Sequence, residues 1–167
     1  AALETTQDVI GGHREGDLAE VVVLYVRGGR LTDTASWSLR TEVATSELLS
    51  AFLTQHYGAG SEGGTVPPDE ILLPCALEVG EGFAELLSER SNRRVAIGTP
   101  KRGPRAGLVK MACDNAEHAF SQKRRAREDT LGRLSEMQER LRLTMLPRRI
   151  ECCDISHLGG ADTVGSI

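Results

Sequence analysis

Aromatic residues are scarce in this chain of 167 residues, which has one Trp, two Tyr and three Phe. Stacking on single-stranded nucleic-acid bases depends on such rings and is poorly supported. Long apolar runs are also missing, because the longest, Val21 to Val26, is far shorter than the roughly 20 residues of a membrane helix. No signal peptide is visible at the start of the sequence. We therefore expect no membrane association.

The four cysteines, at positions 75, 113, 152 and 153, have no C-x-x-C spacing. Zinc and redox motifs are therefore not indicated, and we expect four reduced thiols in a cytoplasmic protein. The sequence also offers no complete acid cluster, nucleophile triad or phosphate-binding loop. An independent enzyme is therefore disfavoured.

The net charge of −4 conceals a strong division along the chain. Residues 1–100 have seven basic and fifteen acidic residues and a net charge of −8, whereas residues 101–149 carry +7 and residues 150–167 carry −3. A basic segment behind an acidic domain is typical of a phosphate-contacting surface. On charge alone, a solvated helix face is the better-supported interpretation.

The valine-rich segment Glu20–Arg27 predicts a strand buried on both faces. Gly28-Gly29 follows it and predicts a two-residue hairpin turn. Counted from this turn, Val26 lies opposite Leu31, and Leu24 lies opposite Asp33. The same register places Ala35, Trp37 and Leu39 on one face of the sheet. Val22, Leu24 and Val26 share that face.

The order of predicted elements indicates the fold class. Three strands in a meander, starting at Thr5, are followed by a helix, a strand, a helix, a strand and a long helix that extends from about Arg105 to Leu141. This order predicts an α/β (α+β) fold with a mixed sheet and helices on its faces. It is also the element order of the RNase H-like fold.

A second hairpin is predicted after Pro147. Its strands are Ile150–Ile155 and Thr163–Ile167, with a turn at residues 158–161. The sequence stops inside the partner strand, and a lone hairpin has no body to pack on. We therefore expect the chain to be a fragment.

Several motifs resemble the UvrC family, the incision subunits of bacterial nucleotide excision repair. The most specific is P-R-R-I-E-C-C-D-I-S-H-L-G-G-A-D-T-V-G-S-I at residues 147–167. Others are V-L-Y-V-R-G-G-R-L (residues 23–31), L-L-S-A-F-L-T-Q-H-Y (48–57), P-P-D-E-I-L-L-P (67–74) and P-K-R-G-P-R (100–105). One departure is Cys153, where an aromatic residue is more usual. The resemblance covers nearly the whole chain.

This resemblance implies a domain organisation. UvrC-like proteins carry a GIY-YIG nuclease, a helical UVR motif that binds UvrB, a central region, an RNase H-like nuclease and helix-hairpin-helix modules. Residues 150–167 then correspond to the first hairpin of the nuclease. From the element order and the lack of further acids beside Asp8, we predict that residues 5–120 form a degenerate, non-catalytic RNase H-like domain and that residues 121–149 form a basic helical connector. The implied partners are damaged double-stranded DNA and, through the parent protein, the UvrB–DNA complex.

The resemblance makes Asp154, in D-I-S-H, the first catalytic acid of the nuclease. Phosphodiester hydrolysis of this type uses about three clustered acids that hold Mg²⁺ or Mn²⁺. The other ligands would lie beyond Ile167, so the fragment alone is expected to be inactive and to bind no metal. Glu151 and Asp162 are interpreted as structural or solvent-facing, and His157 as either a neighbour of the site or a turn residue.

The two parts of the chain share one feature. Asp8 lies on the predicted first strand of residues 5–120, just as Asp154 lies on the predicted first strand of the nuclease. No acid follows on the fourth strand, which ends at Leu73-Pro74. Candidate companions are Glu47 and the helical pair Asp114 and His118, for which a plain surface pair is the better-supported interpretation.

The basic run K-R-R-A-R supplies the candidate DNA contacts Lys123, Arg124, Arg125 and Arg127. Without interleaved aromatics, the expected contact is with phosphates and independent of sequence. The alternative to this DNA-binding role is a non-catalytic structural or protein-interaction module that positions the two nuclease centres without touching DNA.

Overall fold

The computed structural model describes residues 5–58, 65–78, 80–158 and 162–166, with the backbone alone after Cys153. The chain divides into two compact units, which we call unit 1 (up to Lys123) and unit 2 (from Arg124). The domain boundaries predicted at residues 120 and 149 stay predictions.

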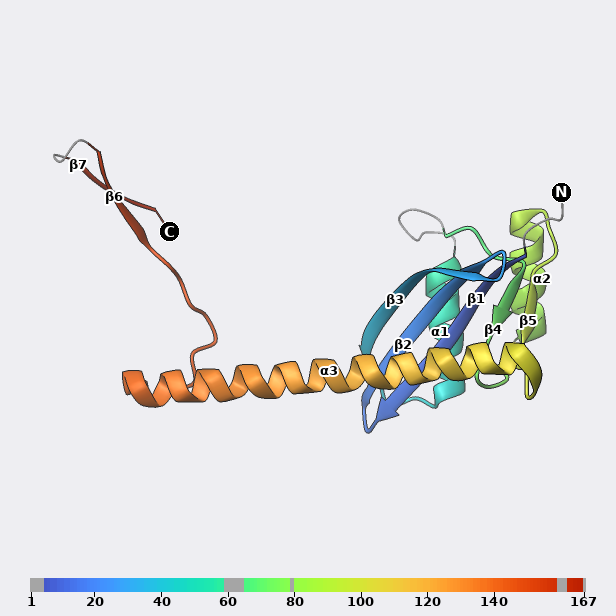
Figure 1. Cartoon of the computed structure of the whole chain (residues 1–167), viewed down its shortest axis with the longest axis horizontal. Helices are drawn as coiled ribbons and strands as arrows, with labels where there is room; N and C mark the ends of the chain where they lie inside the picture. Colours follow the sequence, from blue (N-terminus) through green and yellow to red (C-terminus); the bar gives the residue numbers. More distant parts are fainter. Residues whose placement is uncertain (1–4, 59–64, 79, 159–161, 167) are drawn as a thin grey trace. The chain divides into compact units, whose positions relative to one another are not determined.

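Unit 1 is built on a five-stranded mixed sheet with the strand order β3-β2-β1-β4-β5 (Figure 1). The first three strands are antiparallel neighbours, whereas β4 pairs parallel to both β1 and β5. The strands are β1 (Thr6–Glu15), β2 (Leu18–Arg27), β3 (Arg30–Arg40), β4 (Glu70–Leu72) and β5 (Ala96–Gly98). The predicted mixed sheet after a three-strand meander is confirmed.

Helices cover both faces of this sheet. On one face, α1 (Thr45–Tyr57) and α2 (Gly80–Ser91) contribute Leu49 and Leu87 to a core with Ile10 of β1. On the other face, α3 (Gly103–Leu141) packs its first half over β1 and β2 through Val109, Ala112 and Ala116 (Figure 1). Two apolar cores, one on each face of the sheet, therefore hold unit 1 together.

Strand β2 is buried on both faces, as its run of valines predicts. Residues 19–24 are all buried, and Val23 is 0% exposed. At its end, Gly28 and Gly29 have φ of 56° and 74°, so both adopt the left-handed conformation that a tight hairpin turn requires. The predicted hairpin is thus confirmed.

The predicted register of that hairpin is correct next to the turn and wrong beyond it. Val26 pairs with Leu31, but Tyr25 pairs with Asp33, so Thr32 is an extra residue in β3. The Thr32 hydroxyl donates to the Tyr25 carbonyl at 3.0 Å. This β-bulge shifts the rest of β3 by one position, so that Trp37 faces α1 with Val21, not with Val22.

Unit 2 contains the second half of α3 and a hairpin of β6 (Asp154–Leu158) and β7 (Asp162–Ser166). The hairpin is confirmed, but its first strand begins at Asp154 and not at Ile150. Residues 159–161, in the predicted turn, lie outside the described residues. None of the described helices combines the length and the apolar character that crossing a membrane requires.

The contact of α3 with the sheet depends on a glycine of β1. A Cβ atom built on Gly11 would lie 2.1 Å from the main-chain carbon of Ala112. Real Cβ atoms do not approach a backbone that closely. The helix therefore rests against the strand where β1 has no side chain.

We expect Gly11→Ala to destabilise the protein by about 1–3 kcal/mol, because α3 must move away from the sheet to admit the methyl group. Gly12→Ala is the matched control, since the nearest atom to its Cβ is 3.9 Å away. The free energy of unfolding of both variants is measured in urea. Equal stability of the two would show that α3 does not rest on Gly11.

Candidate functional site

Among the described residues of unit 1, two carboxylates are buried: Asp8 on β1 is 0% exposed and Glu20 on β2 is 1% exposed. A buried carboxylate must be paired and hydrogen-bonded, because removing its charge from water is costly. Asp8 and Glu20 are therefore the candidate residues for a functional site in unit 1. The sequence singled out Asp8, whereas it gave no signal for Glu20.

Asp8 lies in the middle of the sheet, paired with Tyr25 of β2 on one side and with Ile71 of β4 on the other. Its Oδ2 accepts a hydrogen bond from the Tyr57 hydroxyl at 2.5 Å, and its Oδ1 lies 2.8 Å from Nη1 of Arg27. The carboxylate is thus held by a phenol from the end of α1 and a cation from the end of β2.

The Asp8–Arg27 contact is electrostatic and not a hydrogen bond. Nη1 of Arg27 donates to the carbonyls of Gln7 at 2.8 Å and of Val26 at 2.9 Å. The Asp8 Oδ1 is consequently buried with no hydrogen-bond partner among the described residues, although a cation lies against it. The guanidinium is fixed by two backbone carbonyls and neutralises Asp8 by proximity.

Burial raises the pKa of the Tyr57 hydroxyl far above its usual range, and the charge of Asp8 and the hydrogen bond to it raise that pKa further. The phenol therefore stays protonated and remains a donor to Asp8. Burial and the charge of Asp8 also raise the pKa of Tyr25. Neither tyrosine is poised to act as a base.

The other candidate acids do not join Asp8. Glu47 is exposed in the first turn of α1, whereas Tyr57, which contacts Asp8, is at the opposite end, about 15 Å along the helix. Asp114 is on α3, and α3 covers the sheet face opposite to α1.

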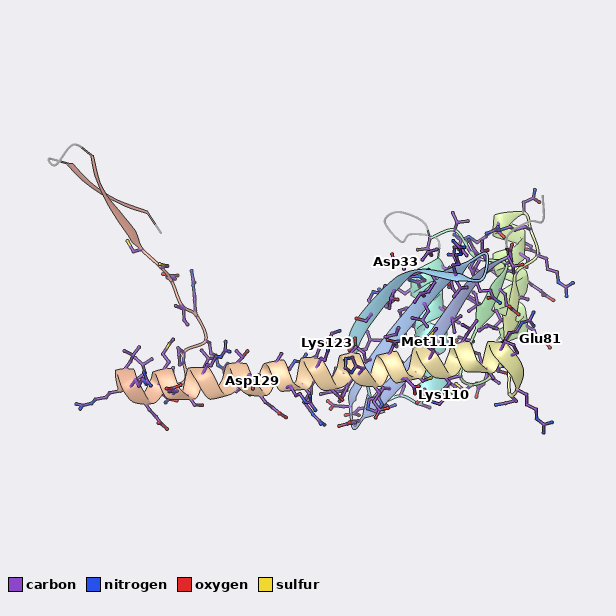
Figure 2. The ribbon with its side chains drawn as sticks, in the orientation of Figure 1. Asp33, Glu81, Lys110, Met111, Lys123 and Asp129 are labelled. Atoms are coloured by element: carbon purple, nitrogen blue, oxygen red, sulfur yellow. The ribbon has the colours of Figure 1, made fainter. Side chains whose placement is uncertain are left out.

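Asp114 and His118 also do not pair with each other in a metal-binding arrangement. Asp114 accepts a hydrogen bond from Lys110 at 2.6 Å, and His118 is hydrogen-bonded to Gln122 at 2.9 Å. Figure 2 labels Lys110 on α3. The interpretation of Asp114 and His118 as surface residues agrees with these contacts.

The residues around Asp8 do not fit a divalent metal ion. Mg²⁺ and Mn²⁺ require several oxygen ligands, with carboxylates prominent among them. Asp8 has a cation and a protonated phenol as its neighbours instead. Over the described part of the chain, no group of three or more His, Cys, Asp or Glu side chains is arranged to hold a metal.

The buried Glu20 forms a second ion pair, with the partly exposed Lys123, on the α3 face of the sheet. Its Oε1 lies 2.5 Å from Nζ of Lys123, and its Oε2 accepts a hydrogen bond from Ser38 at 2.7 Å. Lys123 also donates to the Ser38 hydroxyl at 2.9 Å. The first residue of the basic run therefore fastens α3 to β2 and β3 (Figure 2).

The three arginines of the run differ from Lys123 in exposure. Arg124, Arg125 and Arg127 are all exposed on α3, and Nε of Arg124 lies 3.9 Å from Glu128, one turn further along. An exposed pair at this distance contributes little to stability. The run thus combines one cation that is engaged with the sheet and three that face solvent.

Asp154 is the first residue of β6, and its backbone lies opposite Ser166 of β7. His157 is in the same strand opposite Thr163, and Asp162 begins β7. Glu151 is exposed and forms an ion pair with Arg149 at 2.5 Å. The placement of Asp154 at a strand start is observed, and its role as a ligand stays a prediction.

An aromatic cluster that the sequence did not predict surrounds His56 at the end of α1. Its ring stacks on Phe52, with centroids 5.3 Å apart, and meets Trp37 edge-on at 5.3 Å. Tyr25 and Tyr57 complete the cluster, so four of the six aromatic residues gather here. Trp37 reaches the cluster only because the bulge in β3 turns it towards α1.

Burial in this cluster lowers the pKa of His56, and the opposing charge of Asp8 does not cancel the effect. The folded protein therefore favours the neutral imidazole. The unfolded chain takes up the proton near pH 6.5. As the pH falls below this value, the unfolded chain binds a proton that the folded protein does not bind. The free energy of unfolding therefore decreases as the pH is lowered.

Two family models match the chain. The model described as the UvrC Ribonuclease H-like domain matches residues 6–123, and the one described as the UvrC RNAse H endonuclease domain matches residues 138–167. Among curated relatives, the proteins named UvrABC system protein C of Geobacter metallireducens and Syntrophotalea carbinolica are each 43% identical, over 95% and 96% of this chain.

The chain spans about a quarter of the length of these two relatives, 25% and 26% respectively. Among solved structures, an Endonuclease V of Ciona intestinalis in complex with DNA matches 76% of this chain and 57% of its own, with 14% identity. Its TM-score of 0.30 is too low to support an inference.

We expect the free energy of unfolding to fall as the pH is lowered from about 7.5 to about 5, in part because His56 must remain neutral in the fold. His56→Gln should show a flatter dependence in this window. His118→Gln, which changes an exposed histidine of α3, is the control and should keep the parent's slope. Urea denaturation across the pH range measures the effect, and identical slopes for the parent and His56→Gln would contradict the assignment.

Proposed function

The chain belongs to the UvrC family, and from this premise we propose that it is part of the endonuclease of bacterial nucleotide excision repair. Such proteins cut damaged double-stranded DNA on both sides of a lesion. In this proposal residues 5–120 are a non-catalytic RNase H-like scaffold, residues 121–149 a basic connector, and residues 150–167 the first part of the nuclease that acts.

The observation that carries the proposal is the contrast between Asp8 and Asp154. Asp8 lies within the first strand of its hairpin and Asp154 begins the first strand of its own, but Asp8 is already paired with the Arg27 cation and hydrogen-bonded to the Tyr57 hydroxyl. Asp154 lies in the segment that matches the UvrC RNAse H endonuclease domain. Binding of the catalytic metal ion is therefore assigned to Asp154 and not to Asp8.

Asp154 would hold Mg²⁺ or Mn²⁺ together with further acids of the same nuclease domain. Oxygen ligands of this kind suit these hard cations. When bound, such ions activate a water molecule and stabilise the leaving oxygen of the phosphodiester. The contribution of Asp154 is its negative charge, which draws the ion to the first strand of that domain.

DNA contact is assigned to the basic run, with Arg124, Arg125 and Arg127 as its exposed members. Arginine side chains on a solvated helix face neutralise phosphates without reading sequence. Lys123 shares the run, but its ammonium is engaged by Glu20. The UvrB–DNA complex is the proposed partner of the whole protein.

The second candidate function is a structural module that positions the two nuclease centres without DNA contact. The Lys123–Glu20 ion pair favours it, because it engages the ammonium of one residue of the basic run within unit 1. Both candidates assign the same role to Asp154. They differ in what the arginines do, and salt-dependent DNA binding separates them.

In UvrC-like proteins the RNase H-like centre is assigned to the 5′ cut and the GIY-YIG centre to the 3′ cut. We therefore expect Asp154→Asn to abolish the 5′ incision of a UvrC protein that carries this chain and to spare the 3′ incision. Asparagine keeps the shape of the side chain but removes the charge that holds the metal. The assay is a lesion-bearing duplex labelled at each end in turn, incubated with the complete repair system.

Asp162→Asn is the matched control, because it makes the same chemical change in the same hairpin at a residue to which no metal-binding role is assigned. It should leave both cuts intact. A 5′ cut that persists at the parent's rate in Asp154→Asn would contradict the assignment of Asp154. Loss of both cuts would show that Asp154 acts in folding or assembly.

Replacing Arg124, Arg125 and Arg127 by Glu should flatten the salt dependence of duplex binding by about 0.9 in log–log slope for each phosphate that the variant no longer neutralises. The same replacement of Arg133, Arg140 and Arg142 makes an equal charge change elsewhere in the basic segment and should leave the slope nearly unchanged. Binding to an undamaged duplex is followed from about 50 to about 200 mM salt. Equal slopes for the two triple variants would favour the structural module.

A further inference from the structure

We propose that unit 1 contains a built guanidinium-binding site, filled by its own Arg27, at the place where a nuclease of this fold keeps its first metal-binding acid. The site consists of the Asp8 carboxylate, the carbonyls of Gln7 and Val26, and the ring of Tyr25. The inference concerns unit 1 alone and does not depend on whether the whole protein cuts DNA.

The contacts of Arg27 define what the site recognises. Nη1 donates to two carbonyls, of Gln7 at 2.8 Å and Val26 at 2.9 Å, while it lies 2.8 Å from Oδ1 of Asp8. The Cζ atom is 5.7 Å from the centroid of the Tyr25 ring. Backbone acceptors, one carboxylate and an aromatic ring together suit a planar, weakly hydrated cation.

The same set of groups is poorly suited to a divalent metal. It offers one carboxylate, the second oxygen of that carboxylate is bonded to the Tyr57 hydroxyl, and the Tyr25 ring occupies one side. A hard cation would need further carboxylates or waters in their place. The site therefore selects guanidinium over Mg²⁺ or Mn²⁺.

Two features make the site testable with a small molecule. The Asp8 side chain is 0% exposed, and its Oδ1 has no hydrogen-bond partner in the part of the chain that the structure describes, so it can accept a bond from a donor that reaches it. The Arg27 side chain is 33% exposed. Truncating it to alanine would open a route from solvent to the carboxylate.

The experiment measures the melting temperature of Arg27→Ala in the full chain against added methylguanidinium, with NaCl at equal ionic strength as the reference. We expect a rise of about 2–4 °C at about five times the Kd of the probe, and this rise should continue to grow with the logarithm of the probe concentration. The parent protein should show no such rise, because its site is filled. MnCl₂ should raise the melting temperature of Arg27→Ala by less than methylguanidinium does.

Two further variants test whether the rise comes from this site. Arg90→Ala is the matched control, because Arg90 donates to the Tyr57 carbonyl at 2.5 Å and forms no ion pair with Asp8. It should not respond to methylguanidinium. The double variant Asp8→Asn, Arg27→Ala should also not respond, and it should melt higher than Arg27→Ala because no unpaired carboxylate is buried.

A larger stabilisation of Arg27→Ala by Mn²⁺ would overturn the inference and assign the site to a metal. So would the absence of any response, or an equal response in the double variant. If Arg27→Ala does not fold unaided, circular dichroism should show that the double variant folds. A double variant that is also unfolded would overturn the pairing of Arg27 with Asp8.

Discussion

The carboxylate of Asp8 lies in the middle of a sheet, away from water, and the fold depends on its being neutralised there. An uncompensated buried charge costs about 3–5 kcal/mol when its partner is removed. Arg27 reaches Asp8 from the end of β2, and Tyr57 reaches it from the last turn of α1. One side chain thus links the central strand to a neighbouring strand and to a covering helix. This arrangement also has a functional consequence. A carboxylate that already binds a guanidinium and a phenol is not available to a metal ion.

The opposite face of the sheet carries α3 in a comparably fixed position. Gly11 admits the backbone of Ala112, and the buried Glu20 binds Lys123 at the last position of unit 1. After Lys123 the helix continues with the exposed arginines 124, 125 and 127. Residues 6–123 match the UvrC Ribonuclease H-like domain and residues 138–167 match the UvrC RNAse H endonuclease domain, so the proposed scaffold and the proposed nuclease are separate segments of this chain.

The fold was predictable where local signals were strong. Gly28-Gly29 indicates a turn because both residues must adopt positive φ, and the valines of β2 predict two-sided burial. The bulge at Thr32 was not predictable, because a period of two carries no mark of an extra residue. The partners of Asp8 and Glu20 were not predictable either, since Tyr57 is 49 positions from Asp8 and Lys123 is 103 from Glu20. Only the packing of helices on the sheet brings them together.

The central claim is that Asp8 is neutralised internally and does not bind metal, and Mn²⁺ titration of the ¹⁵N-labelled chain tests it most directly. Paramagnetic broadening reports on metal bound close to an amide, whether or not any reaction takes place. The account predicts that the amide signals of Gln7, Asp8 and Ile71 broaden no more than those of other buried strand residues. Selective broadening of these signals at substoichiometric Mn²⁺ would contradict it and would make the first-strand carboxylate of unit 1 a metal ligand.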